Sequence, residues 1–304
     1  MSRNLRPLDG VLLFDKPLHL SSNIALQKVR RLFQAEKAGH TGTLDPLATG
    51  LLPVCFGEAT KFSTALLNAD KTYFARLRLG RTSTTGDGEG EITITAAVLP
   101  NLAQVKLVLN NFIGGIEQMP PMHSAIKHQG KPLYEYIRKG ETVERALRSV
   151  TIHDLKLEQL GGDELDITVH CSKGTYVRTL AEDIGKALGC GAYLQGLSRT
   201  ATAQFSLESA YTWDQLEAMD MEQRAACLLP VDSLLPQVPA VELQAQQVRR
   251  IAQGQQLDLE TELADGKVRL YSEGEFIGVA ELLGQRLSAD RLVSSVAKNA
   301  ACAD

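Results

Sequence analysis

The chain is organised around the stretch Gly39-His40-Thr41-Gly42-Thr43-Leu44-Asp45-Pro46-Leu47-Ala48-Thr49-Gly50. No helical or strand period runs through this stretch, and its glycines permit positive φ angles. Asp45 precedes a proline, so its backbone is expected to be extended or part of a turn. On local chemistry alone a capped turn fits better than a catalytic loop, because Asp-Pro and Thr-Gly are common turn dipeptides. A lone acid near a histidine on a rigid loop keeps the catalytic interpretation open.

The length and composition predict a cytoplasmic globular protein. The 304 residues are enough for two domains, or for one large domain with an appendage, and 44% of them are hydrophobic. The five cysteines are scattered and form no CxxC pair, so neither a disulfide framework nor a zinc site is expected. The N-terminus lacks the apolar core of a signal peptide, and no apolar run reaches the length of a membrane span.

The charge distribution gives two conflicting indications about nucleic acids. A net charge of −4 argues against a polyanionic partner. Residues 122–140 differ, because they hold four lysines and arginines against one acid. This basic patch suits phosphate contacts and base stacking, but it fits a solvated loop with a short helix equally well. Its basic and aromatic members are His123, Lys127, His128, Lys131, Tyr134, Tyr136, Arg138 and Lys139.

Hydrophobic periodicity and turn residues predict the order of elements along the chain. The expected strands cover residues 10–17, 51–56, 71–80, 91–99, 155–160, 164–171, 193–198, 201–207, 267–272 and 276–282. The expected helices cover residues 23–34, 58–67, 105–112, 175–188 and 243–253. Three prolines mark residues 229–240 as a linker, and the residues beyond it are expected to form a small, mostly β module.

A second group of polar residues lies where a strand meets a helix, at Ser172–Arg178. Free backbone N–H groups at such a junction can hold an anion, and Arg178 could anchor an aspartate or a phosphate. Tyr176 lies beside it, and Tyr73 begins another strand, where a packing role is the commoner one. An ordinary strand-to-helix turn is the alternative for the whole group.

Five motifs follow one another between residues 10 and 206. They are Asp15-Lys16-Pro17 with Ser21-Ser22, the whole of Gly39–Gly50, Lys71-Thr72-Tyr73, Cys171–Leu180 and Leu197-Ser198-Arg199. Taken in this order, they resemble the motifs of the bacterial tRNA pseudouridine synthase B family, which modifies the T-loop uridine at position 55 of tRNA.

The resemblance implies an α/β (α+β) fold with a mixed, largely antiparallel sheet and flanking helices. A catalytic domain would span residues 1–236, with an RNA-binding insertion at about 114–147, and residues 237–304 would form a β-rich, PUA-like RNA-binding module. The implied partner is the T-arm of tRNA. The isomerisation requires no metal or other cofactor, and a monomer is expected.

The resemblance also implies a role for each site residue. Asp45 would be the essential carboxylate, acting as nucleophile or as base on the flipped uridine. The other members would bind the RNA or shape the pocket: His40 filling the space left in the RNA, Tyr73 stacking on the base, Arg178 pairing with Asp45, Tyr176 and Leu197 lining the pocket, and Lys61 lying near it.

Two other functions remain open from sequence. One is an RNA-binding or chaperone protein that folds tRNA without chemistry, although a carboxylate facing phosphates has no use in pure binding. The other is a pseudouridine synthase with a different RNA target.

Overall fold

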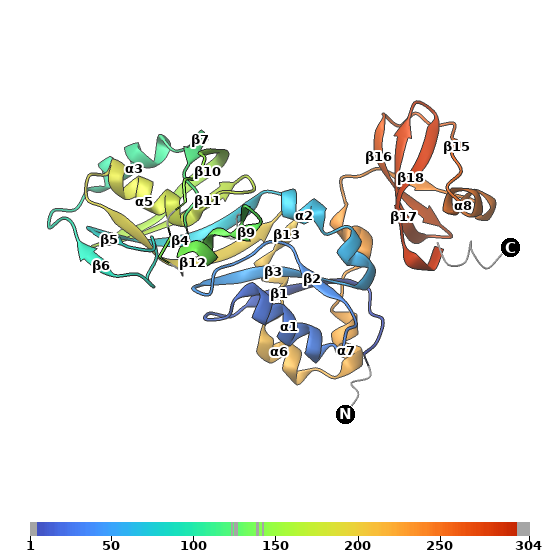
Figure 1. Cartoon of the computed structure of the whole chain (residues 1–304), viewed down its shortest axis with the longest axis horizontal. Coiled ribbons are helices and arrows are strands. Elements are labelled where there is room, and N and C mark those ends of the chain that lie inside the picture. The colour runs from blue at the N-terminus through green and yellow to red at the C-terminus, as the bar shows by residue number, and fades with distance from the viewer. Residues whose placement is uncertain (1–4, 123, 125–126, 138–139, 142, 297–304) are drawn as a thin grey trace.

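A computed structural model describes residues 5–122, 124, 127–137, 140–141 and 143–296. A large twisted sheet carries helices on its faces, and the chain ends in a smaller sheet set to one side (Figure 1). Among the helices of these residues, none combines the length and the apolar character that crossing a bilayer requires.

The largest sheet of the described residues has nine strands, in the spatial order β1-β3-β12-β4-β11-β10-β7, with β2 on β3 and β13 on β12. Among these pairs only β3 and β12 run parallel. The strands are β1 (Gly10–Lys16), β2 (Ala38–His40), β3 (Ala48–Phe56), β4 (Lys71–Leu79), β7 (Gly114–Gln118), β10 (Arg148–Gly161), β11 (Glu164–Cys171), β12 (Ala192–Thr202) and β13 (Phe205–Ser206).

Helices cover this sheet with apolar stripes. The helices are α1 (Ser22–Leu32), α2 (Thr64–Asn68), α3 (Leu102–Asn110), α5 (Val177–Ala187), α6 (Trp213–Ala218) and α7 (Met221–Ala226), with 3-10 turns η1 (Gly57–Lys61), η2 (Leu207–Ser209) and η3 (Val231–Leu234). One core packs α3 and α5 against β4, β10, β11 and β12, and another packs α1 and α6 against β1 and β3. The Ser21 side chain caps α1 by accepting from the Ile24 N–H at 3.3 Å, as its sequence predicts.

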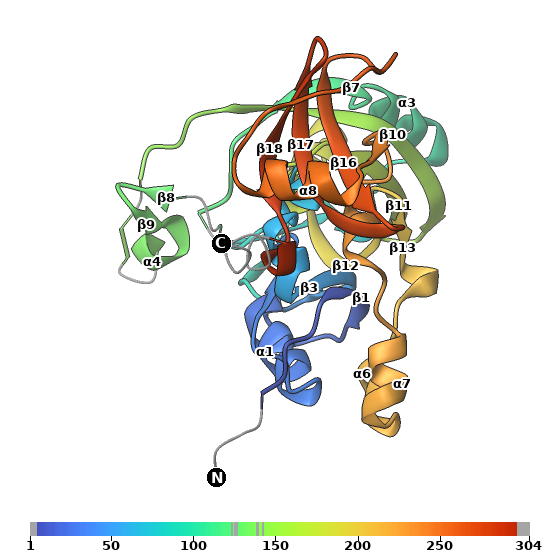
Figure 2. The same ribbon diagram turned by 90° about the vertical axis from the view of Figure 1, so that its right-hand side faces the viewer.

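Two short additions project from the sheet. A ribbon pairs β5 (Arg81–Ser83) with β6 (Ile92–Ile94). The insertion holds a small hairpin of β8 (Lys127–His128) and β9 (Lys131–Pro132) followed by α4 (Leu133–Ile137). Figure 2 shows this hairpin and helix as a separate lobe beside the sheet. His123, Arg138 and Lys139 of the predicted basic patch lie outside the described residues.

The C-terminal part forms its own sheet and core. Its elements are β14 (Ala240–Glu242), α8 (Ala245–Ala252), β15 (Leu257–Asp258), β16 (Gly266–Ser272), β17 (Glu275–Leu283) and β18 (Arg286–Leu292), with the strands in the order β14-β16-β17-β18-β15. Leu270, Leu282 and Leu287 are fully buried at its centre. The mixed, largely antiparallel sheet with flanking helices and this β-rich module confirm the predicted fold class.

Four expected elements differ from the structure. The strand expected at 91–99 is only Ile92–Ile94. The helix expected at 58–67 is divided into η1 and α2, with Phe62 between them packed against Phe276 at 5.3 Å between ring centroids. The strands expected at 193–198 and 201–207 are largely one, because β12 continues to Thr202 and only Phe205–Ser206 is separate.

Candidate active site

The Gly39–Gly50 loop connects β2 to β3, and α1 holds it in place. The buried Ser22 hydroxyl accepts from the Leu44 N–H at 2.7 Å and donates to the Leu44 carbonyl at 3.0 Å. The Ala48 N–H donates to the Asp45 carbonyl at 3.0 Å, which closes a turn with Pro46 at its second position. The loop is therefore a turn, as local chemistry predicts, and that turn fixes the backbone of Asp45.

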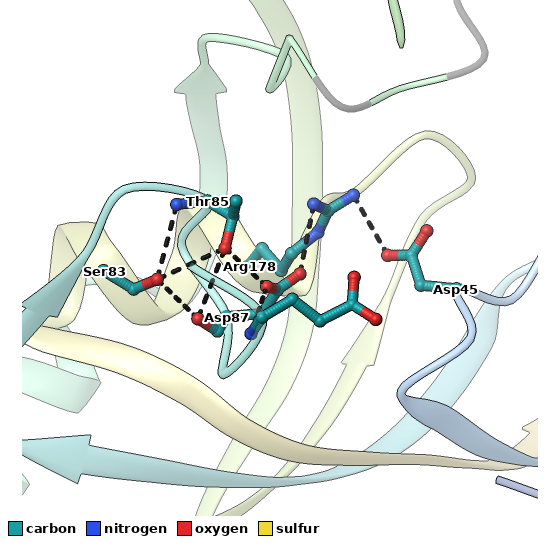
Figure 3. A network of polar contacts seen from close by, with 6 residues as sticks. Asp45, Ser83, Thr85, Asp87 and Arg178 are labelled. Atoms are coloured by element: carbon teal, nitrogen blue, oxygen red, sulfur yellow. Dashed lines mark hydrogen bonds and ion pairs between the residues drawn. The ribbon is translucent and has the colours of Figure 1, made fainter. Parts of the chain in front are cut away.

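Asp45 belongs to a carboxylate–guanidinium–carboxylate network. Arg178 Nη2 lies 3.0 Å from Asp45 Oδ2, and Arg178 Nη1 lies 3.3 Å from Asp87 Oδ2 (Figure 3). The side chains of Arg178 and Asp87 are 7% and 8% exposed, whereas Asp45 is 42% exposed. Asp87 is itself held, because its Oδ1 accepts from the Thr85 hydroxyl at 2.6 Å and from the Glu89 N–H at 3.1 Å. The buried pair thus orients one partly exposed carboxylate.

Arg178 reaches this network from the first turn of α5. The backbone just before it is clamped by the buried Gln118 amide of β7. Gln118 Oε1 accepts from the Tyr176 N–H at 3.0 Å, and Gln118 Nε2 donates to the Tyr176 carbonyl at 3.3 Å. Because the oxygen and the nitrogen of the Gln118 side-chain amide both bond to Tyr176, the start of α5 is fixed relative to the sheet.

A cavity of about 300 Å³ opens over Asp45. It contains five of the predicted site residues: Asp45, Tyr73, Tyr176, Arg178 and Leu197. Its remaining lining comes from the Gly39–Gly50 loop, the end of α2, the start of β4, the insertion, the Ser172–Val177 junction and β12. Those residues are Gly42, Thr43, Leu44, Leu67, Lys71, Ser124, Ser172, Gly174, Thr175, Val177 and Arg199.

Two buried lysines lie near Asp45 or Arg199: Lys71 lines the cavity, and Lys16 interacts with the charges of both residues without lining it. Lys16 is fully buried and donates to the carbonyls of Pro17 and Leu20 at 2.9 and 2.7 Å. Burial lowers the pKa of Lys16 to about 8, although the negative charge of Asp45 acts in the opposite direction. Burial, followed by the charge of Arg199, lowers the pKa of Lys71 to about 8. Both lysines therefore lose their proton at a lower pH than exposed lysines do.

Two predicted site residues do not line the cavity. His40 is half-buried on β2, and burial, followed by the charge of Arg199, lowers the pKa of its imidazole. Lys61 lies at the C-terminal module instead, with Nζ 2.8 Å from Glu58 Oε2, 2.8 Å from the Ser294 hydroxyl and 3.1 Å from the Leu292 carbonyl. Contact of Lys61 with substrate stays a prediction that this geometry does not support.

Sequence reasoning missed three residues of the site. Asp87 falls in residues 81–90, which the sequence indicates only as a polar turn. Lys16 and Arg199 lie inside recognised motifs but received no role. A signal was present for Lys16, because it is a cation at the end of a short apolar strand, where a charge needs internal partners.

The arrangement suits chemistry on a planar, uncharged ring. Asp45 offers an oriented carboxylate at the mouth of a cavity whose walls include two tyrosines and Leu197. Within the described ranges, no group of three or more His, Cys, Asp or Glu side chains is arranged to hold a metal ion. The chain's own groups in the cavity therefore offer one oriented acid, with cations around it.

Comparisons with protein families identify the class of protein that has this fold and site. Residues 30–177 match the N-terminal domain of TruB family pseudouridylate synthases. Residues 178–236 match the C-terminal domain of tRNA pseudouridylate synthase B, and residues 239–293 match the pseudouridine synthase II TruB C-terminal domain. The class is that of the pseudouridylate synthases.

Similar curated proteins narrow the class to a family. The chain is 53% identical over 299 residues to tRNA pseudouridine synthase B of Cupriavidus metallidurans, covering 95% of each chain. It is 54% identical over 296 residues to the protein of the same name from Burkholderia mallei, covering 95% of this chain and 98% of that one. The chain belongs to the TruB family of pseudouridylate synthases.

Solved structures share the fold at lower sequence identity. A chain of a Cbf5–Nop10–Gar1 complex superposes with a TM-score of 0.71 at 24% identity, covering 93% of this chain and 84% of that one. A chain of an H/ACA RNP bound to a substrate RNA containing 2'-deoxyuridine gives 0.70 at 22% identity, with coverages of 93% and 84%. This likeness extends over the nine-stranded sheet and the C-terminal module together.

Proposed function

We propose that this protein isomerises the uridine at position 55 in the T-loop of tRNA to pseudouridine, with Asp45 as the essential carboxylate. Family membership supports the reaction type, since the similar proteins are tRNA pseudouridine synthases. The observation that carries the assignment of Asp45 is its ion pair with the buried Arg178 at the mouth of the cavity.

The reaction exchanges one bond of the base for another. The bond from N1 to the sugar C1′ breaks, and C5 bonds to the same carbon. C5 loses its hydrogen and N1 gains one, so the product is an isomer and no oxidant is consumed. An ionised Asp45 serves either as nucleophile at C1′ or as base at the sugar. In both cases the ion pair with Arg178 keeps the Asp45 carboxylate directed at the cavity.

The size of the cavity supports a flipped base as the bound group. Small-molecule sites in proteins start at about 300 Å³, which matches this cavity. A uridine stacked within the T-loop cannot reach Asp45, so it leaves the stack. In this proposal Tyr73 stacks on the base, Tyr176 and Leu197 line its pocket, and His40 fills the space left in the RNA.

The remaining parts of the chain serve to hold the tRNA. We infer a catalytic domain of residues 1–236 and a C-terminal module of residues 237–304, and we assign RNA contacts to the insertion at 114–147 and to the module. The supporting observations are the lobe formed by the insertion and the separate core of the module. The protein acts as a monomer in the cytoplasm on the T-arm.

The test replaces Asp45 by asparagine. Tritium release from tRNA carrying [5-³H]uridine reports loss of the C5 hydrogen, and filter binding reports the Kd for tRNA. Asp45→Asn is expected to reduce tritium release to background while leaving the Kd near that of the wild type. Normal turnover by this variant would contradict the assignment.

The matched control is Asp166→Asn. Asp166 also pairs with an arginine, Arg76, at 2.7 Å, but it does not line the cavity. Its replacement is expected to leave the tritium-release rate unchanged. Mapping the product in a mixed RNA pool separates position 55 from another target. Wild-type binding of tRNA without tritium release would favour the chaperone function instead.

A further inference from the structure

The chain places an arginine at the centre of its largest sheet. Arg199 is 1% exposed and lies on β12, the strand between β3 and β4. Its Cα partners are Gly50 on β3 and Tyr73 on β4. Directly opposed residues on neighbouring strands have side chains in contact range. Arg199 thus connects the end of the Gly39–Gly50 loop to the start of the strand that carries Tyr73.

The guanidinium of Arg199 holds the backbone of the Gly39–Gly50 loop and of the residue that follows it. Its Nε donates to the Leu51 carbonyl at 2.7 Å, and its Nη2 donates to the Gly42 carbonyl at 3.2 Å. Gly42 lies three residues before Asp45 in the same loop. Movement of this guanidinium would therefore shift the loop that presents Asp45.

Arg199 also lies opposite Tyr73 across β12 and β4, and both residues line the cavity. Because a guanidinium has donors only, the Tyr73 oxygen is the acceptor in any contact between these two side chains. Among the ion pairs of the described residues, none includes Arg199. Burial raises the pKa of Tyr73 and lowers that of Arg199, and their mutual contact opposes both changes.

We propose that Arg199 is a positioning residue for pseudouridine formation, which fixes the Tyr73 phenol relative to Asp45 because its guanidinium packs against Tyr73 and bonds the Gly42 carbonyl of the Gly39–Gly50 loop. This inference rests on the proposed function, because it assigns Tyr73 to the flipped base. Arg199 acts through the Tyr73 phenol and through the Gly42 carbonyl. Lysine keeps the charge of Arg199 but loses the planar fork that reaches both.

The first test is a double-mutant cycle of Arg199→Lys and Tyr73→Phe, measured as single-turnover tritium release at saturating tRNA. Arg199→Lys is expected to slow the reaction about tenfold to a hundredfold, as small misplacements of catalytic groups do, with little change in Kd. In the Tyr73→Phe background the same substitution is expected to have a much smaller effect. The proposal would be overturned if the rate loss of the double variant equalled the product of the losses of the two single variants.

Arg224→Lys is the matched control for this cycle. Arg224 also donates its Nε to a carbonyl, that of Leu216 at 2.7 Å, but it does not line the cavity. Its replacement is expected to leave the tritium-release rate unchanged. Urea unfolding of each variant checks that the slow ones are folded at the assay temperature.

The second test needs no RNA, so its outcome is independent of the proposed function. 3-Fluorotyrosine at position 73 has a more acidic phenol than tyrosine, and its ¹⁹F signal reports ionisation. Arg199→Gln removes the facing cation and is expected to move the titration midpoint to higher pH, with Arg199→Lys in between. An unchanged midpoint in both variants would show that Arg199 does not act on Tyr73. Absence of tritium release by the wild type would refute the proposed function alone.

Discussion

At the scale of single residues, the geometry of the site depends on the two carboxylates that pair with the Arg178 guanidinium. One nitrogen faces Asp45 and the other faces the buried Asp87. A guanidinium is planar, so a fixed acceptor on one nitrogen sets the direction of the other. Asp87 therefore determines where Arg178 holds Asp45, although the reacting base need not touch Asp87.

We expect Asp87→Asn to slow tritium release by about tenfold to a hundredfold, because the orientation of Arg178 is loosened. The Kd for tRNA is expected to stay near the wild-type value. Single-turnover tritium release and filter binding measure the two quantities. Asp163→Asn is the control, since Asp163 pairs with Arg78 at 2.6 Å outside the cavity. An equal loss of rate and affinity would mean that Asp87 serves binding instead.

The sequence predicts only part of this site. Asp45 and Arg178 are recognisable from their motifs, and the structure joins them in an ion pair. Asp87 is not recognisable, because an aspartate between two glycines is what any polar turn contains. Its contact with Arg178 crosses 91 positions of the chain. Only the folded sheet brings such distant positions together, so no local pattern could reveal the network.

At the scale of elements, most strands and helices follow from hydrophobic periodicity, and β12 shows where periodicity fails. The sequence predicts two strands there, but the structure has one that continues past two irregularities in its pairing with β4, at Leu194/Gly196 and at Arg199/Ala201. A bulge shifts the alternation of side chains by one position, so a continuous strand resembles two in sequence.

Where β3 meets β12, we expect one added methyl group, at Gly50, to lower the free energy of unfolding strongly. Gly50 has φ +98°, and a Cβ there would clash with the Arg199 carbonyl oxygen. Gly50→Ala is expected to reduce the free energy of unfolding by about 3 kcal/mol or more. Urea denaturation gives the difference.

Gly39→Ala is the control within the same loop. A Cβ at Gly39 would meet only Thr60 Cγ2, at 3.9 Å, and its φ is not in the left-handed region. Its effect on the free energy of unfolding is expected to stay below about 1 kcal/mol. Equal effects of the two substitutions would contradict this account of the junction.

At the scale of the whole molecule, the C-terminal module contacts the rest of the chain through an apolar cluster that includes Phe62 and Phe276, and through polar groups around Lys61. Glu58 Oε2 accepts from the Ser294 N–H at 2.8 Å, next to the Lys61 ammonium. Burial acts to raise the pKa of Glu58, but the Lys61 and Ser294 donors lower it overall. Such a carboxylate stabilises the folded state above its ordinary pKa of 4.5 and loses this effect as the pH falls below that value.

We expect Lys61→Met to loosen the module by about 1–2 kcal/mol, because it leaves Glu58 without its cation. Faster limited proteolysis within residues 236–239 at pH 7 would report this. The difference from the wild type should shrink as the pH falls from 4.5 through the lowered pKa of Glu58, because the carboxylate is then protonated. Lys156→Met, which removes an exposed pair with Glu158, is expected to change nothing. Unchanged proteolysis of the Lys61 variant would show that apolar contacts alone hold the module.

The place of β12 between β3 and β4 has a consequence for biosynthesis. β3 and β4 are close in sequence, yet the strand that separates them is made more than a hundred residues later. A chain emerging from the ribosome therefore has both strands before it has the partner that joins them, and each offers an open edge until residues 192–202 are available. Open edges invite pairing with other chains. The nascent enzyme thus passes through an aggregation-prone stage that ends when the strand carrying Arg199 is inserted.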